Sequence, residues 1–262
     1  MLKTNKSIVP LGQTSGWENL KGRRRPSRVG DKSPAGPGQR QKFKVQEKPG
    51  FKYLNVTISG LPGAGSSTLG KALSKVLCWR YFCGGDFMRE YATNKGLFNK
   101  NNKVHHDATI YGESFDRQVD FGMRQALKTN SRQILESWLS SFMAQGIKGT
   151  LKILVYCSDD AVRVDRIVNR DNITVKKAKH HIFEREKKNV EKWKAVYQHQ
   201  WQEWVVDTGT LDKSKPIWFW YPELYDLTID TYKNSKEETL KIALASLGFQ
   251  KPIDYNNIFA SE

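Results

Sequence analysis

Residues 60–67, with the sequence Gly-Leu-Pro-Gly-Ala-Gly-Ser-Ser, constrain the fold more than any other part of the chain. They follow an alternating apolar segment, 54–59, and precede a segment, 67–77, whose apolar residues fall on one helical face. A strand, a glycine-rich turn and a helix in this order form a loop whose N–H groups converge on a phosphate. Only glycine adopts the backbone angles of such a turn readily. We therefore predict that a nucleotide's phosphates bind to Gly60, Gly63, Ala64, Gly65, Ser66, Ser67 and Thr68.

Position 66 differs from most loops of this kind. The usual residue is lysine, which reaches the β- and γ-phosphates, whereas this chain has Ser66. The next residue, Ser67, carries the hydroxyl that normally binds Mg²⁺. We expect ATP and Mg²⁺ as the ligands, and the positive charge that phosphoryl transfer requires has to come from other residues.

The rest of the chain predicts an α/β fold. Further apolar strand segments lie at 81–83, 133–135, 151–156 and 224–229, and helical segments separate them, which predicts a five-stranded parallel sheet flanked by helices. Ser235 and Glu238 form a capping box that opens a last helix. Residues 174–204 have helical periodicity and few helix breakers, and the aromatic face of this segment favours packing or a partner surface over a ligand site.

The positive charge is concentrated at the N-terminus. The chain of 262 residues has a formal net charge of +16, and residues 1–52 hold 13 of its 43 Lys and Arg but only 3 of its 27 Asp and Glu. We predict a basic extension over 1–52, a main domain over 53–250 and a C-terminal tail over 251–262. The extension has three interpretations: a solvated tail, a mitochondrial targeting segment, or an arm that binds RNA phosphates. The arm would use Arg23, Arg24, Arg25, Arg28, Arg40, Lys42 and Lys44.

Composition excludes several classes of protein. Three cysteines without a Cys-x-x-Cys pair indicate a reducing, intracellular compartment, the cytoplasm or the mitochondrial matrix, and we interpret all three as small apolar residues. No apolar run is long enough for a membrane span, and no apolar signal-peptide segment is present. Residues 105–107 read His-His-Asp, but neighbouring histidines point apart and we expect no metal site there.

Several motifs resemble those of the cytidylate kinases, in particular the archaeal-type members of the nucleoside-monophosphate kinase family. Residues 58–68 are similar to the family loop, in which many members carry threonine at the position of Ser66, and residues 85–90 and 225–231 are similar to two other family segments. The resemblance covers residues 55–247 and implies a P-loop fold with a monophosphate-binding insert and a lid. It implies that Asp86, Arg89 and Glu136 bind the acceptor, and that the catalytic charges come from Arg163, Arg166, Arg170 and Arg185.

The chain also departs from the family pattern. The third strand in the family usually ends Glu-Gly-Arg, whereas residues 136–138 read Glu-Ser-Trp, and the two lid arginines align with Val190 and Lys192. Glu136 has two interpretations, a carboxylate that orients Mg²⁺-bound water or a solvated strand end. Two functions follow: transfer of the ATP γ-phosphoryl group to CMP or dCMP, or a non-catalytic kinase fold bound to rRNA or ribosomal proteins through residues 1–52. The sequence does not decide between them.

Overall fold

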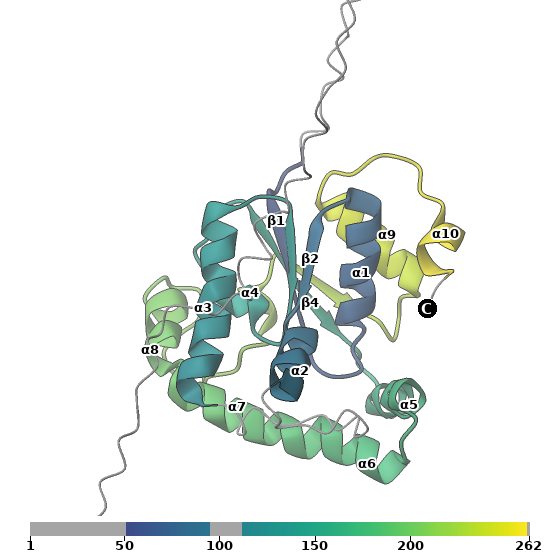
Figure 1. Cartoon of the computed structure of the whole chain (residues 1–262). Helices are drawn as coiled ribbons and strands as arrows, with labels where there is room; N and C mark the ends of the chain where they lie inside the picture. Colours follow the sequence, from purple (N-terminus) through teal and green to yellow (C-terminus); the bar gives the residue numbers. More distant parts are fainter. Residues whose placement is uncertain (1–50, 95–111, 261–262) are drawn as a thin grey trace, which may run out of the picture. The chain divides into compact units, whose positions relative to one another are not determined.

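The computed structural model describes residues 51–94 and 112–260, in which helices cover both faces of a parallel β-sheet (Figure 1). The strand order is β2-β3-β1-β4-β5, and every neighbouring pair is parallel, as the sequence predicts. Every residue of the central strand is buried, including the polar residues of its alternating pattern. The strands are β1 (Asn55–Gly60), β2 (Arg80–Cys83), β3 (Gln133–Glu136), β4 (Thr150–Tyr156) and β5 (Leu227–Asp230).

One face of the sheet packs against α1 (Ser66–Leu77) and α9 (Lys236–Ser246). The apolar stripe of α1 places Leu69 and Leu73 against β1, and both side chains are buried. The predicted capping box begins α9, because the Ser235 hydroxyl accepts from the Glu238 N–H and the Glu238 carboxylate accepts from the Ser235 N–H. This face therefore holds the first hydrophobic core.

The other face packs against α3 (Glu113–Thr129), α4 (Ser140–Met143) and α8 (Gln198–Trp201). A second core of aromatic residues lies here, in which Phe142 contacts the rings of Tyr197, Trp201 and Phe219. The aromatic stripe of residues 193–204 is thus packed inside the protein, as predicted. A third, small apolar cluster joins α5 (Asp160–Asp171) to α6 (Val175–Lys179).

The segment 174–204 is helical, as its periodicity predicts, but it is not one regular α-helix. The segment consists of α6, a π-helical turn η3 (His180–Glu184), α7 (Arg185–Val196), α8 and a second π-helical segment η4 (Gln202–Val206). Tyr197 breaks the helix between α7 and α8 with φ −112° and ψ 18°. Its fully buried ring is held in the second core, so tertiary packing overrides local helix propensity at this position.

Near the C-terminus, the last strand and the predicted tail differ from expectation. The fifth strand begins at Leu227 and not at residue 224, because Leu224 ends a short 3-10 turn, η5 (Pro222–Leu224), and is buried there. Residues 251–260, predicted as a tail, contain α10 (Tyr255–Phe259), which packs against α1. Lys75 of α1 donates a hydrogen bond to the carbonyl oxygen of Ile258 over 2.6 Å.

The cysteines are unpaired, with Cys157 buried and Cys83 partly buried. Cys78 is exposed at the C-terminal cap of α1 with φ 54°, so the interpretation of all three as packed apolar residues fails for Cys78.

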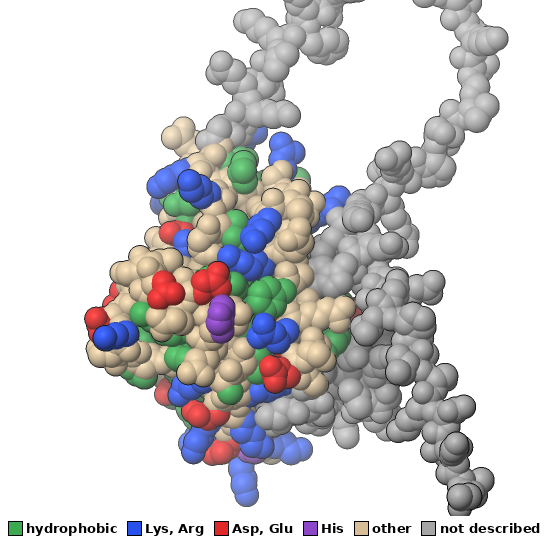
Figure 2. All heavy atoms as spheres, turned by 90° about the vertical axis from the view of Figure 1, so that its left-hand side faces the viewer, with side chains coloured by type: hydrophobic (Ala, Val, Ile, Leu, Met, Phe, Trp, Pro, Cys, Tyr) green, Lys and Arg blue, Asp and Glu red, His purple; other side chains and the backbone are tan. Residues whose placement is uncertain are grey.

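The face that carries α3 and α8 has mixed charge. Figure 2 shows lysine, arginine, aspartate and glutamate side chains interspersed with apolar ones over the described part of this face. No helix within residues 51–94 and 112–260 is long and apolar enough to cross a membrane.

Candidate nucleotide-binding site

The glycine-rich loop joins β1 to α1 at the end of the sheet beside α2 (Gly84–Asn94) (Figure 1). Gly63 and Gly65 have φ of 81° and 95°, a region that other residues rarely adopt. A Cβ atom on Gly63 would lie 2.7 Å from the carbonyl oxygen of Arg163, so a side chain there would collide with the backbone of α5. The loop is therefore built around glycine for both backbone angle and space.

Glu136 ends β3 directly beside this loop. Its carboxylate accepts hydrogen bonds from Ser66 Oγ at 2.9 Å, Ser67 Oγ at 3.2 Å and Tyr81 Oη at 3.3 Å, and the residue is only 6% exposed. Burial, and next the charge of Glu136, raise the pKa of Tyr81 far above its usual value, so this donor stays neutral. Within the described ranges Glu136 has no ion-pair partner, so a buried acidic group faces the loop with neutral donors only.

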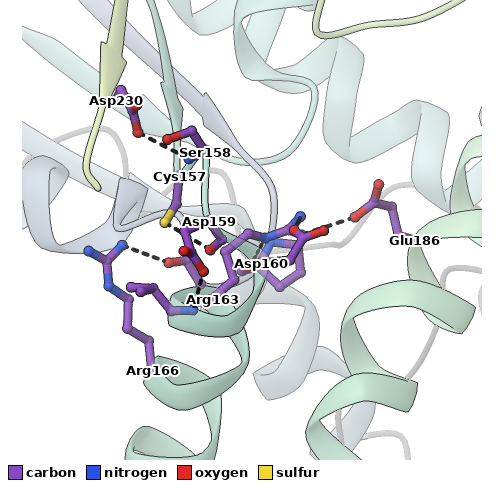
Figure 3. A network of polar contacts seen from close by, with 11 residues as sticks. Cys157, Ser158, Asp159, Asp160, Arg163, Arg166, Glu186 and Asp230 are labelled. Atoms are coloured by element: carbon purple, nitrogen blue, oxygen red, sulfur yellow. Dashed lines mark hydrogen bonds and ion pairs between the residues drawn. The ribbon is translucent and has the colours of Figure 1, made fainter. Parts of the chain in front are cut away.

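Arg163 of α5 bonds to the glycine-rich loop and to two carboxylates, and Figure 3 shows it beside both carboxylates, Asp160 and Glu186. Its Nε donates to the carbonyl oxygen of Pro62 at 3.1 Å, Nη1 to Asp160 Oδ1 at 2.9 Å and Nη2 to Glu186 Oε2 at 3.1 Å. The side chain is 9% exposed. Burial raises the pKa of Glu186, and the hydrogen bond from Arg163 opposes this shift. The arginine thus clamps α5 and α7 to the loop, and each of its three guanidinium nitrogens donates one of these hydrogen bonds.

Arg166 and Thr231 form a second support. Arg166 Nη1 donates to the Gly63 carbonyl oxygen at 3.1 Å and to Thr231 Oγ1 at 2.8 Å, and its Nη2 donates to the Thr231 carbonyl oxygen at 2.8 Å. The Thr231 hydroxyl donates in turn to the Ala64 carbonyl oxygen at 2.8 Å. We did not identify Thr231 or Tyr81 as site residues from the sequence, although Thr231 lies in the segment 225–231 that resembles the family.

A cavity of about 1430 Å³ opens above the loop. Its lining includes seven basic and three acidic residues, so it suits a polyanion. It brings together most of the residues predicted from the sequence: Gly60, Gly63, Gly65, Ser66, Ser67, Thr68, Asp86, Arg89, Glu136, Arg166, Arg170 and Arg185. Ala64 and Arg163 do not line it. The Ala64 side chain is buried in the first core, and Arg163 is buried where it bonds to the Pro62 carbonyl oxygen.

Three predicted arginines reach the cavity from different elements. Arg89 of α2 pairs with Asp86 one turn earlier, and both side chains are about half exposed. Arg170 near the end of α5 pairs with Asp171 at 2.8 Å. Arg185, the first residue of α7, lies with its guanidinium carbon 5.1 Å from the centroid of the Trp138 ring. Lys71, Lys233 and Lys236 complete the basic lining.

The residues at the two positions where the family resemblance predicts lid arginines, Val190 and Lys192, do not line the cavity. Val190 is buried in the second core. Lys192 Nζ lies 2.6 Å from Asp116 Oδ2 on α3, and neither residue lines the cavity. Burial raises the pKa of Asp116 while Lys192 opposes that shift, so this ion pair joins α7 to α3 and its cation does not face the loop.

Two groups of predicted residues cannot be placed. The basic residues assigned to RNA binding, from Arg23 to Lys44, lie outside the described residues, as do the histidines at 105 and 106. Among the residues that the structure does describe, no cluster of His, Cys, Asp and Glu has the arrangement of a metal site.

Comparison with known proteins agrees with this geometry. Residues 55–233 match the model of the cytidylate kinase-like family. The cytidylate kinase of Methanopyrus kandleri is 31% identical over 201 residues, which cover 73% of this chain and 92% of that protein. The cytidylate kinase of Methanothrix thermoacetophila is 32% identical over 192 residues, or 73% and 96% of the two chains. Among solved structures, an uncharacterized protein from Eubacterium ventriosum has the same fold, with a TM-score of 0.52, 11% identity, and coverage of 75% and 99%.

Proposed function

The chain belongs to the cytidylate kinase-like family, and from this premise we propose that it binds ATP with Mg²⁺ and transfers the γ-phosphoryl group to CMP or dCMP. The observation that carries this proposal is the cavity, in which the phosphate loop, Glu136 and arginines from three helices share one space. The named relatives are cytidylate kinases, which supports a cytidine nucleotide as the acceptor.

The loop would hold the ATP phosphates through its N–H groups and the N-terminus of α1. The donor set beside it fits Mg²⁺, because Ser67 and the buried Glu136 offer hard oxygen ligands and Glu136 lacks an ion-pair partner within the described ranges. When bound, Mg²⁺ would neutralise charge on the β- and γ-phosphates. Ser66 contributes no charge, so its role is to orient Glu136.

The acceptor would bind on the side of α2, with its phosphate near Arg89 and Asp86. An acceptor phosphate oxygen attacks the γ-phosphorus of ATP, the bond from that phosphorus to the β–γ bridging oxygen breaks, and ADP and CDP result. Protein groups catalyse such a transfer mainly by position and placed charge. Arg166, Arg170 and Arg185 line the cavity and supply that charge, while Arg163 fixes the loop beneath them.

The experiment is a coupled kinase assay with CMP, dCMP, UMP and AMP as acceptors. Arg89→Gln, purified in parallel, controls for a contaminating host kinase, because it should raise KM for the acceptor if the activity belongs to this chain. Calorimetry with ATP and Mg²⁺ tests the loop separately. Turnover on none of the four acceptors would refute the kinase proposal, and absence of ATP binding at millimolar concentration would refute the loop's role as well.

A second candidate function is a non-catalytic kinase-fold component of a ribosome or another RNA-containing assembly, in the cytoplasm or the mitochondrial matrix. The observation that favours it is the set of residues at the three expected arginine positions: Trp138, a buried Val190 and a Lys192 paired with Asp116. One arginine in such a site is worth roughly 10³–10⁵ in rate. The basic extension over 1–52 would supply the RNA contacts.

The test of this second function is RNA binding at several salt concentrations. The affinity should fall steeply with salt and should be lost when residues 1–50 are deleted. A matched control replaces the seven predicted basic residues of the extension with glutamine and leaves its length unchanged. RNA affinity that survives both changes would contradict the arm's role, and nucleotide turnover by the deleted protein would show that the kinase domain works without it.

A further inference from the structure

Trp138 forms a rigid wall of the cavity two residues after Glu136. Its ring packs edge-on against Trp193 of α7, with centroids 5.3 Å apart at 73°, and against Trp220, at 6.2 Å and 68°. Both neighbours are buried in the second core. An aromatic ring that two buried rings hold in this way has little freedom to rotate, so it presents a fixed surface to the cavity.

Arg185 lies over this surface. Its guanidinium carbon is 5.1 Å from the centroid of the Trp138 ring, within the roughly 6 Å range of a cation–π contact, and both residues line the same cavity. Arg185 is also the residue at which the π-helical turn η3 gives way to the regular helix α7. The contact therefore fixes the end of a long, otherwise adaptable side chain at the point where the helix geometry changes.

The contact between Trp138 and Arg185 differs in kind from the carboxylate contacts of two neighbouring cations. Arg163 is held by the carboxylates of Asp160 and Glu186, and Lys192 is held by Asp116, so in both cases an anion cancels much of the charge. The face of an indole ring attracts a cation through its quadrupole and carries no net charge. The Trp138 ring thus contacts the guanidinium of Arg185 and adds no negative charge of its own beside it.

We propose that Trp138 is a positioning residue that holds the charge of Arg185 in the cavity for the phosphoryl group in transfer. The assignment rests on the proposed kinase function. It explains how a chain with tryptophan at the end of this strand can still bring an arginine to the site: the tryptophan selects the position of an arginine from a different element. The residue itself has no group that exchanges protons or phosphoryl groups with the substrate.

The test is a double-mutant cycle with Trp138→Leu and Arg185→Gln, and with Trp138→Phe as the conservative variant. In the Arg185 background, Trp138→Leu should lower kcat roughly tenfold with little change in the dissociation constant of ATP. In the Arg185→Gln background the same change should alter kcat less than about twofold, because the group that Trp138 positions is absent. Trp138→Phe keeps an aromatic face and should recover most of kcat.

A matched control separates this role from general packing. Arg124 lies 3.9 Å from the centroid of the Trp204 ring, an arginine–tryptophan contact outside the cavity lining. Trp204→Leu should lower the midpoint of thermal unfolding but leave kcat of the folded protein unchanged. Melting curves of all variants show which of them are folded at the assay temperature.

Two results would overturn the assignment. Equal loss of kcat from Trp138→Leu with and without Arg185 means that Trp138 acts independently of the arginine, and a Trp138→Phe variant as slow as Trp138→Leu means that the aromatic face is irrelevant. If the wild type shows no turnover, the same double-mutant cycle is measured as the affinity of each variant for a bisubstrate analogue that joins adenosine to cytidine through a polyphosphate chain. Absence of turnover refutes the proposed kinase function, and absence of analogue binding as well refutes this assignment with it, whereas turnover with additive effects refutes this assignment alone.

Discussion

The hydroxyl of Ser66 donates a hydrogen bond to Glu136 Oε1 over 2.9 Å. This contact ties the first residue of α1 to the last residue of β3, and it turns the side chain at the usual lysine position toward a carboxylate. The loop is therefore matched to Glu136, and in the proposed kinase the charge that a lysine would provide would come from the basic residues that line the cavity.

Replacing Glu136 with glutamine should separate stability from activity. Glutamine keeps an acceptor for Ser66 and Tyr81 but removes a buried charge that has no ion-pair partner among the described residues. Because burying a charge is costly, we expect the unfolding temperature to stay equal or rise, while kcat falls roughly 10²-fold through loss of the metal-facing carboxylate. Thermal melts and initial rates measure the two effects. A variant with full activity would remove Glu136 from the site.

Gly63→Ala should abolish ATP binding. The new Cβ would lie 2.7 Å from the Arg163 carbonyl oxygen, in addition to the strain of φ 81°. Gly146 has a similar φ of 73° but open space around it, so Gly146→Ala carries the strain alone and should cost about 1 kcal/mol of unfolding free energy with ATP affinity intact. Calorimetry and urea unfolding of both variants test this. Equal ATP affinity in the two variants would contradict the close fit of the loop against α5.

Arg163→Ala should destabilise the fold by about 3 kcal/mol, because it leaves Glu186 and the Pro62 carbonyl oxygen without their donor. Adding Glu186→Gln should recover part of this loss, since the uncompensated carboxylate is then gone. Lys194→Ala breaks the exposed pair with Glu191 and should change stability by less than about 0.5 kcal/mol. Urea unfolding gives all three values. An Arg163→Ala variant as stable as the wild type would show that the clamp is unnecessary for folding.

Asp120 should make stability fall as pH rises. Tyr197 Oη donates to its carboxylate over 2.5 Å, Asp116, Arg117 and Lys192 lie nearby, and burial raises the pKa of Asp120 to about 7. The folded state therefore binds more protons than the unfolded state between about pH 4 and pH 7, so stability is lost across this range.

Asp120→Asn removes this titration. The difference in unfolding free energy, variant minus wild type, should increase by about 2 kcal/mol between about pH 5 and about pH 8, because only the wild type loses stability over this range. Urea unfolding at each pH measures this difference. Glu191→Gln replaces an exposed carboxylate and should leave the pH dependence unchanged. If the wild type and Asp120→Asn lose stability in parallel, Asp120 titrates normally in the folded protein.

Local sequence patterns predicted the sheet well. The strand at 151–156, the helix after the loop and the capping box at Ser235 each depend on residues within one short segment, and the structure has all three in place. The phosphate loop and Glu136 could also be placed together, because the carboxyl ends of neighbouring parallel strands meet at one edge of the sheet.

Long-range contacts explain what the sequence could not predict. The break at Tyr197 depends on a ring buried against Phe142, more than fifty positions away, and no helical pattern reveals it. Arg163 and Arg166 are three positions apart in α5, and only the fold shows that Arg163 bonds to the Pro62 carbonyl oxygen away from the cavity while Arg166 also lines the cavity. In the sequence, Trp138 shows only that the arginine of the family pattern is absent. Its contact with Arg185 depends on how α7 packs against the sheet, which the sequence does not reveal.

The C-terminal helix has a practical consequence for how the protein is handled. Phe259 of α10 lines the cavity, although the family match ends at residue 233. Trimming the chain at 250 would remove α10, and with it Phe259 from the cavity lining and the apolar side chains that pack against the first core. Assays of a protein trimmed in this way therefore measure a cavity that lacks Phe259, and a shortened protein made for such assays should keep α10.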